Sequence, residues 1–263
     1  MIPGIESMEN AFNIKGKNVI VTGGNRGIGK GIVIAMAQSG ANIAILARDE
    51  ATSKKTIEEI DSYGGKYRYY KCDVTDTKRA KAVVDEVVKE FGTIDVLVNN
   101  AGIARFFNVL DEDEDLRSWH DVINLNLNGY FTMSYLVGKV MKKQNYGRII
   151  NISSNSSRIV NLPQRMVSYN VSKAGIDRMT KCLAHEWAEY NIRVNAIAPG
   201  YTETELTFDK DQDKIEYWMS ATPVGRFGKT IEIGALAVYL ASPASEQMTG
   251  AVLTIDGGYS LAR

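Results

Sequence analysis

The residues of this chain best placed to do chemistry are a tyrosine and a lysine four positions apart, Tyr169 and Lys173. Residues at positions i and i+4 of a helix share one face, so the phenol and the ammonium group would stand side by side. A free tyrosine has a pKa of about 10, too high for ready proton exchange at neutral pH. Because a neighbouring cation favours the phenolate and lowers that pKa, the pair predicts a general acid/base. This spacing also occurs by chance on amphipathic helices. Motifs elsewhere in the chain must therefore distinguish a catalytic pair from a packed tyrosine beside a solvated lysine.

The elements that would position this pair alternate between short apolar runs and longer amphipathic segments. We expect strands over residues 17–22, 42–47, 66–72, 95–99, 148–153, 193–198 and 252–256. We expect helices over residues 28–38, 50–63, 78–91, 119–143, 167–190 and 230–240. Short apolar strands separated by helices are typical of a parallel sheet covered on both faces. The pattern predicts an α/β fold with a single Rossmann-like doubly wound parallel sheet, and residues 1–263 as one domain.

Charge and composition exclude several classes of protein. Lys+Arg and Asp+Glu both number 31, so no overall basic field points to nucleic acid or a membrane surface. No window approaches about 18 uncharged apolar residues, and the first 13 residues lack the order of a signal peptide. Cys72 and Cys182 suggest no disulfide framework, and His120 and His185 lack metal-ligand spacing. We therefore expect a cytoplasmic protein without a metal, nucleic-acid or membrane partner.

A glycine-rich turn follows the first expected strand, in the sequence Thr22-Gly23-Gly24-Asn25-Arg26-Gly27-Ile28-Gly29. Glycine lets backbone approach a pyrophosphate, and the next helix offers unpaired N–H groups and a positive dipole end. The spacing differs from the general Gly-x-Gly-x-x-Gly fingerprint. Its place between the first strand and the first helix nevertheless favours a nucleotide over a structural turn.

The end of the second expected strand indicates which dinucleotide would bind. An acidic residue there would select NAD by bonding the ribose 2′-hydroxyl, but this chain has Ala47 followed by Arg48. Arginine pairs with a 2′-phosphate, and Arg26 in the glycine-rich turn could add a second cation. The pattern predicts NADP(H). The alternative is that Arg48 is a surface residue paired with Asp49 or Glu50.

Polar or small residues also follow the third and fourth expected strands. Asp73 and Val74 would meet the adenine, and Asn100-Ala101-Gly102 would let backbone pass close to a ribose. Each segment could instead be an ordinary turn, because Asn, Asp and Gly favour turns. Their repeated position at the carboxyl ends of strands, where open α/β sheets bind ligands, favours a site.

The order of these motifs resembles that of the short-chain dehydrogenase/reductase family. The resemblance covers nearly the whole chain from about Asn13 to Tyr259. The resemblance rests on the glycine-rich turn, Asn99-Asn100-Ala101-Gly102, Asn126-Leu127-Asn128-Gly129, Ser154, the Tyr169/Lys173 pair, Pro199-Gly200 and Ile255-Asp256-Gly257-Gly258. It implies hydride transfer between a nicotinamide and a carbonyl or alcohol carbon. It also implies catalytic roles for Asn126, Ser154, Tyr169 and Lys173.

The resemblance assigns each catalytic residue a role. Tyr169 would exchange the proton of the substrate oxygen, and a serine would donate a hydrogen bond to that oxygen. Lys173 would lower the tyrosine pKa and hold the nicotinamide ribose, and Asn126 would anchor a water that relays protons. The serine is Ser154 when counted from the fifth strand but Ser156 when counted back from Tyr169. We favour Ser154, since it is fixed to the strand end, and keep Ser156 as the alternative.

The predicted cofactor-binding residues come from all of these segments. They are Gly23, Asn25, Arg26, Gly27, Ile28, Arg48, Asp73, Val74, Asn100, Ala101, Gly102, Tyr169, Lys173, Pro199, Gly200, Thr202 and Thr204. Thr202 and Thr204 belong to a segment, about residues 201–227, that the resemblance implies is a mobile lid over substrate and nicotinamide. The alternative for this segment is a helix that packs in the core or against another subunit.

The stretch over residues 154–164, which leads to Tyr169 and is named the substrate loop, resembles that of the ketose/polyol reductases, such as mannitol 2-dehydrogenases and sorbose reductases. Asn155, Arg158, Asn161 and Gln164 offer hydrogen-bonding groups suited to hydroxyls. Alternatives are a 3-oxoacyl-carrier-protein reductase, a general carbonyl reductase, or a non-catalytic NADP(H)-binding sensor or scaffold. The family also implies a homo-oligomer, a tetramer or dimer formed through the two long helices.

Overall fold

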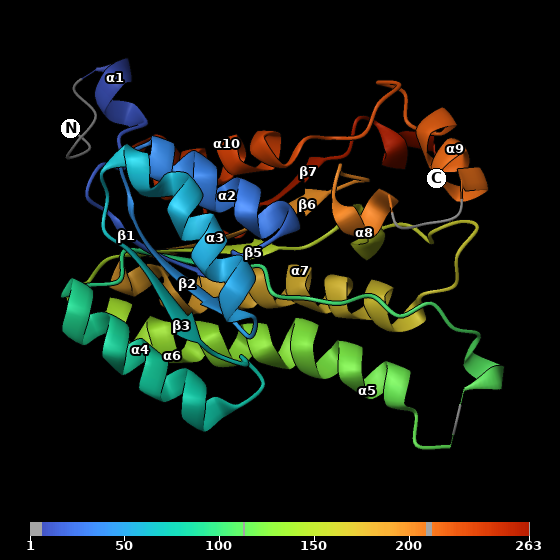
Figure 1. The fold of residues 1–263 in the computed structure, drawn as a ribbon, viewed down its shortest axis with the longest axis horizontal. Helices are drawn as coiled ribbons and strands as arrows, with labels where there is room; N and C mark the ends of the chain where they lie inside the picture. The colour runs from blue at the N-terminus through green and yellow to red at the C-terminus, as the bar shows by residue number, and fades with distance from the viewer. Residues whose placement is uncertain (1–6, 113, 209–211, 263) are drawn as a thin grey trace.

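The computed structural model describes residues 7–112, 114–208 and 212–262 (Figure 1). Its strands form one seven-stranded parallel sheet in the order β3-β2-β1-β4-β5-β6-β7. The strands are β1 Asn18–Thr22, β2 Asn42–Ala47, β3 Tyr67–Lys71, β4 Val96–Asn99, β5 Gly147–Ile152, β6 Ile192–Pro199 and β7 Val252–Ile255. The predicted doubly wound α/β fold is confirmed. The prediction of one domain over residues 1–263 extends beyond the described residues and stays a prediction.

Helices cover both faces of the sheet. On one face lie α2 Gly27–Gln38, α3 Glu50–Ile60 and α10 Thr230–Ala241, and on the other α4 Thr77–Phe91, α6 Gly129–Gln144 and α7 Val167–Trp187 (Figure 1). Successive strand side chains point to opposite faces. In β1, Val19 and Val21 therefore join the core beneath α2 and α10, whereas Ile20 joins the core beneath α4, α6 and α7. This alternation explains why the central strands β1, β2 and β4 are mostly apolar on both faces, whereas the edge strand β3 carries the exposed Arg68 and Lys71.

The expected helix over residues 119–143 is interrupted in the structure. It consists of α5 Arg117–Ile123, a π-helical turn over Asn124–Asn128, and α6. The fully buried side chain of Asn126 lies in this turn and bonds both polar backbone groups of Ile103 at 2.9 Å. Helical periodicity cannot predict such a turn, because it depends on a contact with a distant segment. Short π-helical turns are frequent at functional sites.

Three short helices lie outside the expected elements: α1 Met8–Ala11, α8 Glu205–Phe208 and α9 Gln212–Ser220. They are too short to give a clear periodic pattern. The last two lie in the predicted lid over residues 201–227, of which residues 209–211 fall outside the described part of the chain. No helix among the described residues is long and apolar enough to cross a membrane.

The strand order reverses between β1 and β4, since β2 and β3 extend the sheet on one side and β4 to β7 on the other. Open α/β sheets bind ligands in the crevice beyond the carboxyl ends of the strands at such a point. The glycine-rich turn after β1 and the segment 100–102 after β4 both lie there. The fold thus brings together two of the segments selected from the sequence.

Candidate active site

The turn between β1 and α2 is shaped to admit a phosphate group. Gly23 and Gly27 have φ angles of +63° and +52°, in the region that favours glycine. A Cβ on Gly29 would lie 2.2 Å from the Gly23 carbonyl oxygen and 2.4 Å from Asn100 Nδ2. The first turn of α2 has no acidic residue and no side-chain cap from Arg26. Its unpaired N–H groups and positive dipole end therefore suit a pyrophosphate.

Asn100 locks the ends of β1 and β4 together. Its Nδ2 donates to the carbonyl oxygens of Thr22 and Gly23 at 3.0 and 3.1 Å. The Thr22 hydroxyl accepts from the backbone N–H groups of Asn100 and Ala101 at 2.9 and 3.1 Å. A Cβ on Gly102 would lie only 3.1 Å from Asn126 Oδ1. The side chain of Asn100 thus stabilises the glycine-rich turn, and contact of residues 100–102 with a cofactor stays a prediction.

Two arginines flank the end of β2. The exposed Nη1 of Arg48 lies 3.8 Å from Asp73 Oδ2, a long surface pair instead of a pair with either acidic residue that follows it. Asp49 caps α3 by accepting from the Thr52 backbone N–H at 2.9 Å. Hydrogen bonds from Thr52, and more weakly the charge of Arg26, lower the pKa of Asp49. Both guanidinium groups therefore lie close to the end of β2, and contact of either with a ribose 2′-phosphate stays a prediction.

Three other residues predicted at the cofactor make contacts within the protein. Asn25 Nδ2 donates to Thr52 Oγ1 at 2.7 Å, and Ile28 packs against the core beneath α2. Val74 is buried, and its Cγ2 would lie 2.8 Å from a Cβ on Gly129 at the start of α6. Their side chains have structural contacts, so only their backbone or remaining surface is open to a cofactor.

The segment after β6 returns toward the glycine-rich turn. β6 ends at Pro199, and the buried Thr202 donates to the Gly200 carbonyl oxygen at 3.1 Å. The Thr204 methyl carbon lies 3.6 Å from the position that a Cβ on Gly27 would take. The beginning of the predicted lid therefore lies directly over the proposed phosphate site.

Tyr169 and Lys173 lie one turn apart on α7. Lys173 Nζ donates to the carbonyl oxygen of Ile152, at the end of β5, at 2.7 Å and lies 5.4 Å from the centre of the Tyr169 ring. Burial lowers the pKa of Lys173 to about 7, an effect opposed by the charge of Asp177. Burial raises the pKa of Tyr169, and a hydrogen bond with Ser154 opposes that rise. The expected lowering of the tyrosine pKa by Lys173 is thus not observed, because desolvation dominates in this interior site.

The two candidate serines occupy different positions relative to Tyr169. Ser154, two residues after the end of β5, lies close enough to Tyr169 for its hydroxyl to oppose the rise in the Tyr169 pKa. Its hydroxyl also donates to Ser156 Oγ at 3.0 Å and accepts from the Ser156 backbone N–H at 3.1 Å. Between them, Asn155 is buried, and its Nδ2 has no hydrogen-bond partner among the described residues. Of the two serines, Ser154 is therefore the one in contact with the tyrosine.

Asn126 connects the segment after β4 with α7. Besides its two bonds to Ile103, its Nδ2 lies 3.2 Å from the hydroxyl of Ser172, which itself donates to the Tyr169 carbonyl oxygen at 2.7 Å. Asn126 thus fixes the helix that carries Tyr169. A water held by Asn126 stays a prediction.

Sequence analysis missed two tyrosines at this site. The buried hydroxyl of Tyr130 donates to the Ile152 carbonyl oxygen at 3.1 Å, the same atom that accepts from Lys173. Tyr201 stacks on Trp218 with ring centres 4.3 Å apart, and its electrostatic effect adds to the rise in the Tyr169 pKa. Neither residue belongs to a motif. Tyr201 and Trp218 lie in the predicted lid over residues 201–227, which is the one prediction that pointed to this region.

The substrate loop differs from expectation in how its polar side chains are used. Arg158 turns away to β7, where its Nη1 donates to Thr254 Oγ1 at 3.0 Å, because the edge of that strand offers unpaired acceptors. Gln164 donates to the Tyr201 hydroxyl at 2.7 Å, and Asn161 Oδ1 accepts from Asn170 at 3.1 Å. Arg158 is therefore engaged by β7, Gln164 and Asn161 are largely engaged within the protein, and a contact of any of them with substrate stays a prediction. The Asn155 Nδ2 donor has no partner among the residues that the structure describes.

Comparison with known proteins agrees with this arrangement. The sequence family described as enoyl-(acyl carrier protein) reductase matches residues 23–260. A sorbose reductase of Candida albicans is 38% identical over 95% of this chain and 89% of its own length. An NADP-dependent mannitol dehydrogenase of Alternaria alternata is 39% identical over 98% of this chain and 97% of its own length.

Solved structures give the same result. A short-chain type dehydrogenase/reductase from Mycobacterium marinum superposes with a TM-score of 0.93 at 37% identity, over 97% of this chain and 99% of that one. Among the described residues of the present chain, no three His, Cys, Asp or Glu side chains gather in a group that could hold a metal ion. This chain belongs to the short-chain dehydrogenase/reductase family.

Proposed function

We propose that this protein is an NADP(H)-dependent oxidoreductase acting on the carbonyl group of a ketose and on the secondary alcohol of the corresponding polyol. The observation that carries the proposal is the position of Ser154 close to Tyr169, one turn from Lys173 and beside the crevice of a dinucleotide-type fold. The relatives named as sorbose reductase and NADP-dependent mannitol dehydrogenase support the substrate class and the cofactor.

The side chains divide the chemistry among them. A nicotinamide cofactor bound along the crevice supplies or accepts the hydride. In reduction, the Tyr169 phenol donates its proton to the substrate oxygen while the Ser154 hydroxyl donates a hydrogen bond to the same atom. In alcohol oxidation, Tyr169 accepts that proton. With its pKa near 7, Lys173 can exchange a proton at neutral pH, and we assign it the ribose as partner.

The preference for NADP(H) follows from the charges at the end of β2. Arg48 and Arg26 are exposed there, and Ala47 stands where a carboxylate would select NAD. The pair of Arg48 with Asp73 is long and exposed, so a phosphate can compete for the guanidinium group. The uncapped start of α2 fits the pyrophosphate of either dinucleotide.

The test is the initial rate of NADPH oxidation, with NADH in parallel, on a panel of carbonyl compounds. The panel holds fructose, sorbose, xylulose, an acetoacetyl thioester and a small aromatic ketone, with Tyr169→Phe as control. Ketose turnover that prefers NADPH and is lost in the variant supports the proposal. Preference for the thioester would replace it with fatty-acid chemistry, and NADPH binding without turnover of any compound would favour a sensor or scaffold.

We also propose a homo-oligomer in the cytoplasm. Support for assembly comes from α6, where Phe131 and Tyr135 are exposed and stacked with ring centres 6.5 Å apart, and from the exposed Val171 on α7. Light scattering coupled to size exclusion measures the mass in solution. A monomer at micromolar concentration would contradict the assembly.

A further inference from the structure

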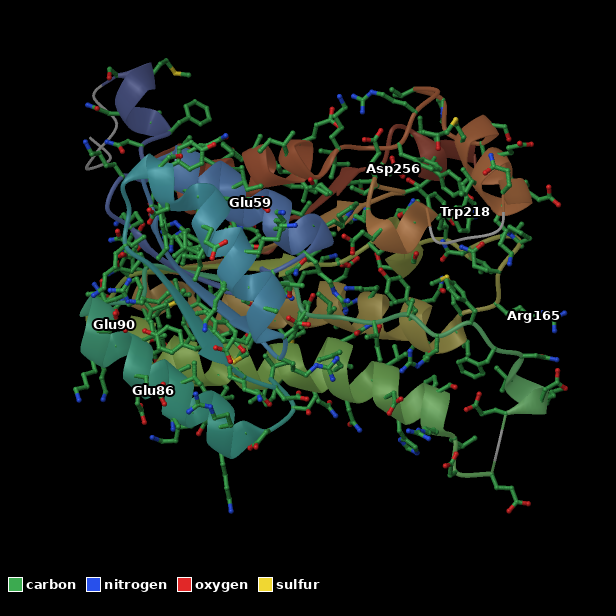
Figure 2. All side chains as sticks on the ribbon, in the orientation of Figure 1. Glu59, Glu86, Glu90, Arg165, Trp218 and Asp256 are labelled. Atoms are coloured by element: carbon green, nitrogen blue, oxygen red, sulfur yellow. The ribbon has the colours of Figure 1, made fainter. Side chains whose placement is uncertain are left out.

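A pocket of about 330 Å³ lies at the end of the molecule that carries α9. Its apolar lining includes the rings of Phe106, Phe107 and Trp218, and its polar lining comes from Gln164, Arg165 and Lys214. Figure 2 shows Arg165 and Trp218 at the same end of the molecule, on the substrate loop and on α9. Three segments distant in sequence therefore form one concave surface.

Two contacts connect this pocket with the catalytic residues. Gln164, in its lining, donates to the Tyr201 hydroxyl at 2.7 Å, and Trp218, also in its lining, stacks on the Tyr201 ring. Tyr201 in turn is close enough to Tyr169 to affect its pKa. The Tyr201 side chain thus contacts the lining of the pocket and lies near Tyr169. A substrate whose carbonyl oxygen contacts Tyr169 can extend its other end toward the pocket.

The walls of the pocket are held by hydrogen bonds between the segments. The Trp218 indole N–H lies 3.2 Å from the Leu162 carbonyl oxygen and 3.1 Å from Gln164 Oε1. The Phe107 backbone N–H donates to the Arg165 carbonyl oxygen at 3.2 Å. These bonds fix α9 and the segment after β4 to the substrate loop, so the shape exists before a ligand binds. Preorganisation of this kind reduces the cost of binding.

The described residues of the lining carry only positive charge. Arg165 is exposed, Lys214 is half-buried, and neither forms an ion pair with any described residue. No carboxylate lines the pocket among the residues that the structure describes. The half-buried Lys214 is less well solvated than a cation on an open surface, which strengthens its attraction for an anion. A neutral sugar leaves this attraction unused.

We propose that the pocket binds an anionic group, a carboxylate or a phosphate, at the end of the substrate remote from its carbonyl. The preferred substrate is then an acidic ketose in place of a neutral one. This inference rests on the proposed ketose chemistry and narrows it. Arg165 and Lys214 are its specificity-determining residues, and Gln164 and Trp218 hold the wall that separates them from Tyr169.

The experiment compares substrates that differ in one terminal group. L-Sorbose and 5-keto-D-gluconate differ only in whether the terminal carbon is a hydroxymethyl group or a carboxylate, and D-fructose 6-phosphate is set against D-fructose in the same way. We expect kcat/KM to be at least about 10-fold higher for the acidic member of one pair, equivalent to ~1.4 kcal/mol. The pair that responds identifies the anion as carboxylate or phosphate.

Variants then locate the effect. Arg165→Gln or Lys214→Gln should raise KM for the acidic ketose about 5- to 10-fold and leave kcat/KM for the neutral ketose within about 2-fold. Lys143→Gln, at the exposed far end of α6, is the matched control and should change neither. The advantage of the acidic substrate should also shrink as salt rises, because both cations border solvent.

The outcomes separate this inference from the function on which it rests. Turnover of neutral ketoses without preference for either acid would overturn the anion site and leave the ketose chemistry standing. An acid preference that survives in the Arg165/Lys214 double variant would also overturn it. Absence of turnover with every ketose, neutral or acidic, would overturn the proposed function itself.

Discussion

Replacement of Ser154 by alanine tests the catalytic arrangement most directly. The variant removes the hydroxyl that opposes the rise in the Tyr169 pKa and that we expect to donate to the substrate oxygen. Loss of one donor aimed at a developing oxyanion costs about 10²–10³ in kcat. Ser154 also bonds Ser156, whose hydroxyl can move toward the vacated position. We therefore expect a loss near the lower end, about 10²-fold, with little change in the affinity for NADPH.

The pH dependence of the same variant has a definite sign. Burial raises the pKa of Tyr169, and the bond with Ser154 opposes that rise. Without this bond the pKa must rise further. Alcohol oxidation needs the phenolate, so its rate in Ser154→Ala should reach its plateau at higher pH than in the wild type. Ketone reduction needs the protonated phenol, so it should persist to higher pH.

Ser156→Ala is the matched control. Ser156 contacts Ser154 through one neutral hydrogen bond, worth about 0.5–1.5 kcal/mol, so its loss should lower kcat by no more than about 10-fold. Steady-state rates from pH 6 to pH 10 in both directions measure these effects. Full activity in Ser154→Ala together with a large loss in Ser156→Ala would refute the reasoning. The loop would then place the second serine at the substrate.

Three further predictions concern the cofactor site and the buried lysine. Arg48→Asp should weaken NADPH binding about 100-fold and spare NADH, measured by NADPH fluorescence, since a carboxylate would face the 2′-phosphate; unchanged affinity would contradict the NADP(H) assignment. Lys173, with its pKa of about 7, loses its proton in the folded state as the pH rises above 7, whereas the unfolded chain keeps it to about pH 10, so stability should rise with pH in this range. Urea unfolding of wild type and Lys173→Met at pH 7 and pH 9 isolates this slope, and equal slopes would reject it. Gly29→Ala, whose Cβ would meet the Gly23 carbonyl oxygen, should lose about 1–3 kcal/mol of stability and most NADPH affinity, whereas Gly228→Ala, with no atom nearer than 3.8 Å, should not.

The fold could be predicted from local patterns. Most strands are short, mostly apolar runs, and most long helices are continuous helical stretches, so both follow from residues near one another in sequence. The parallel orientation of the strands follows because at least one helix lies between each strand and the next one along the chain. The short helices α8 and α9 and the π-helical turn around Asn126 could not be predicted this way. They depend on packing against other segments, as the bonds of Asn126 to Ile103 illustrate.

The residues of the candidate site show the same difference between what local sequence predicts and what depends on packing. Residues within motifs, such as Tyr169 and Lys173, could be selected because their spacing on one helix brings them together. The consequence of burial could not be foreseen, because the pKa of Lys173 depends on how completely β5 and α6 cover it. Arg158 looked suited to a substrate hydroxyl by residue type alone. In the folded chain the edge of β7 supplies acceptors within its reach, and the side chain is directed there.

Tyr130 shows why the chemistry of a site needs the packed structure. Its hydroxyl and the Lys173 ammonium group donate to one carbonyl oxygen, that of Ile152, and the three residues come from α6, α7 and β5. The Lys173 Nζ also lies 5.3 Å from the centre of the Tyr130 ring, close enough for the ring to favour the charged amine. No spacing in the sequence relates these residues. A motif predicts the position of the acid/base pair. The protonation of the pair depends on groups from the elements that pack against it, and no motif specifies these.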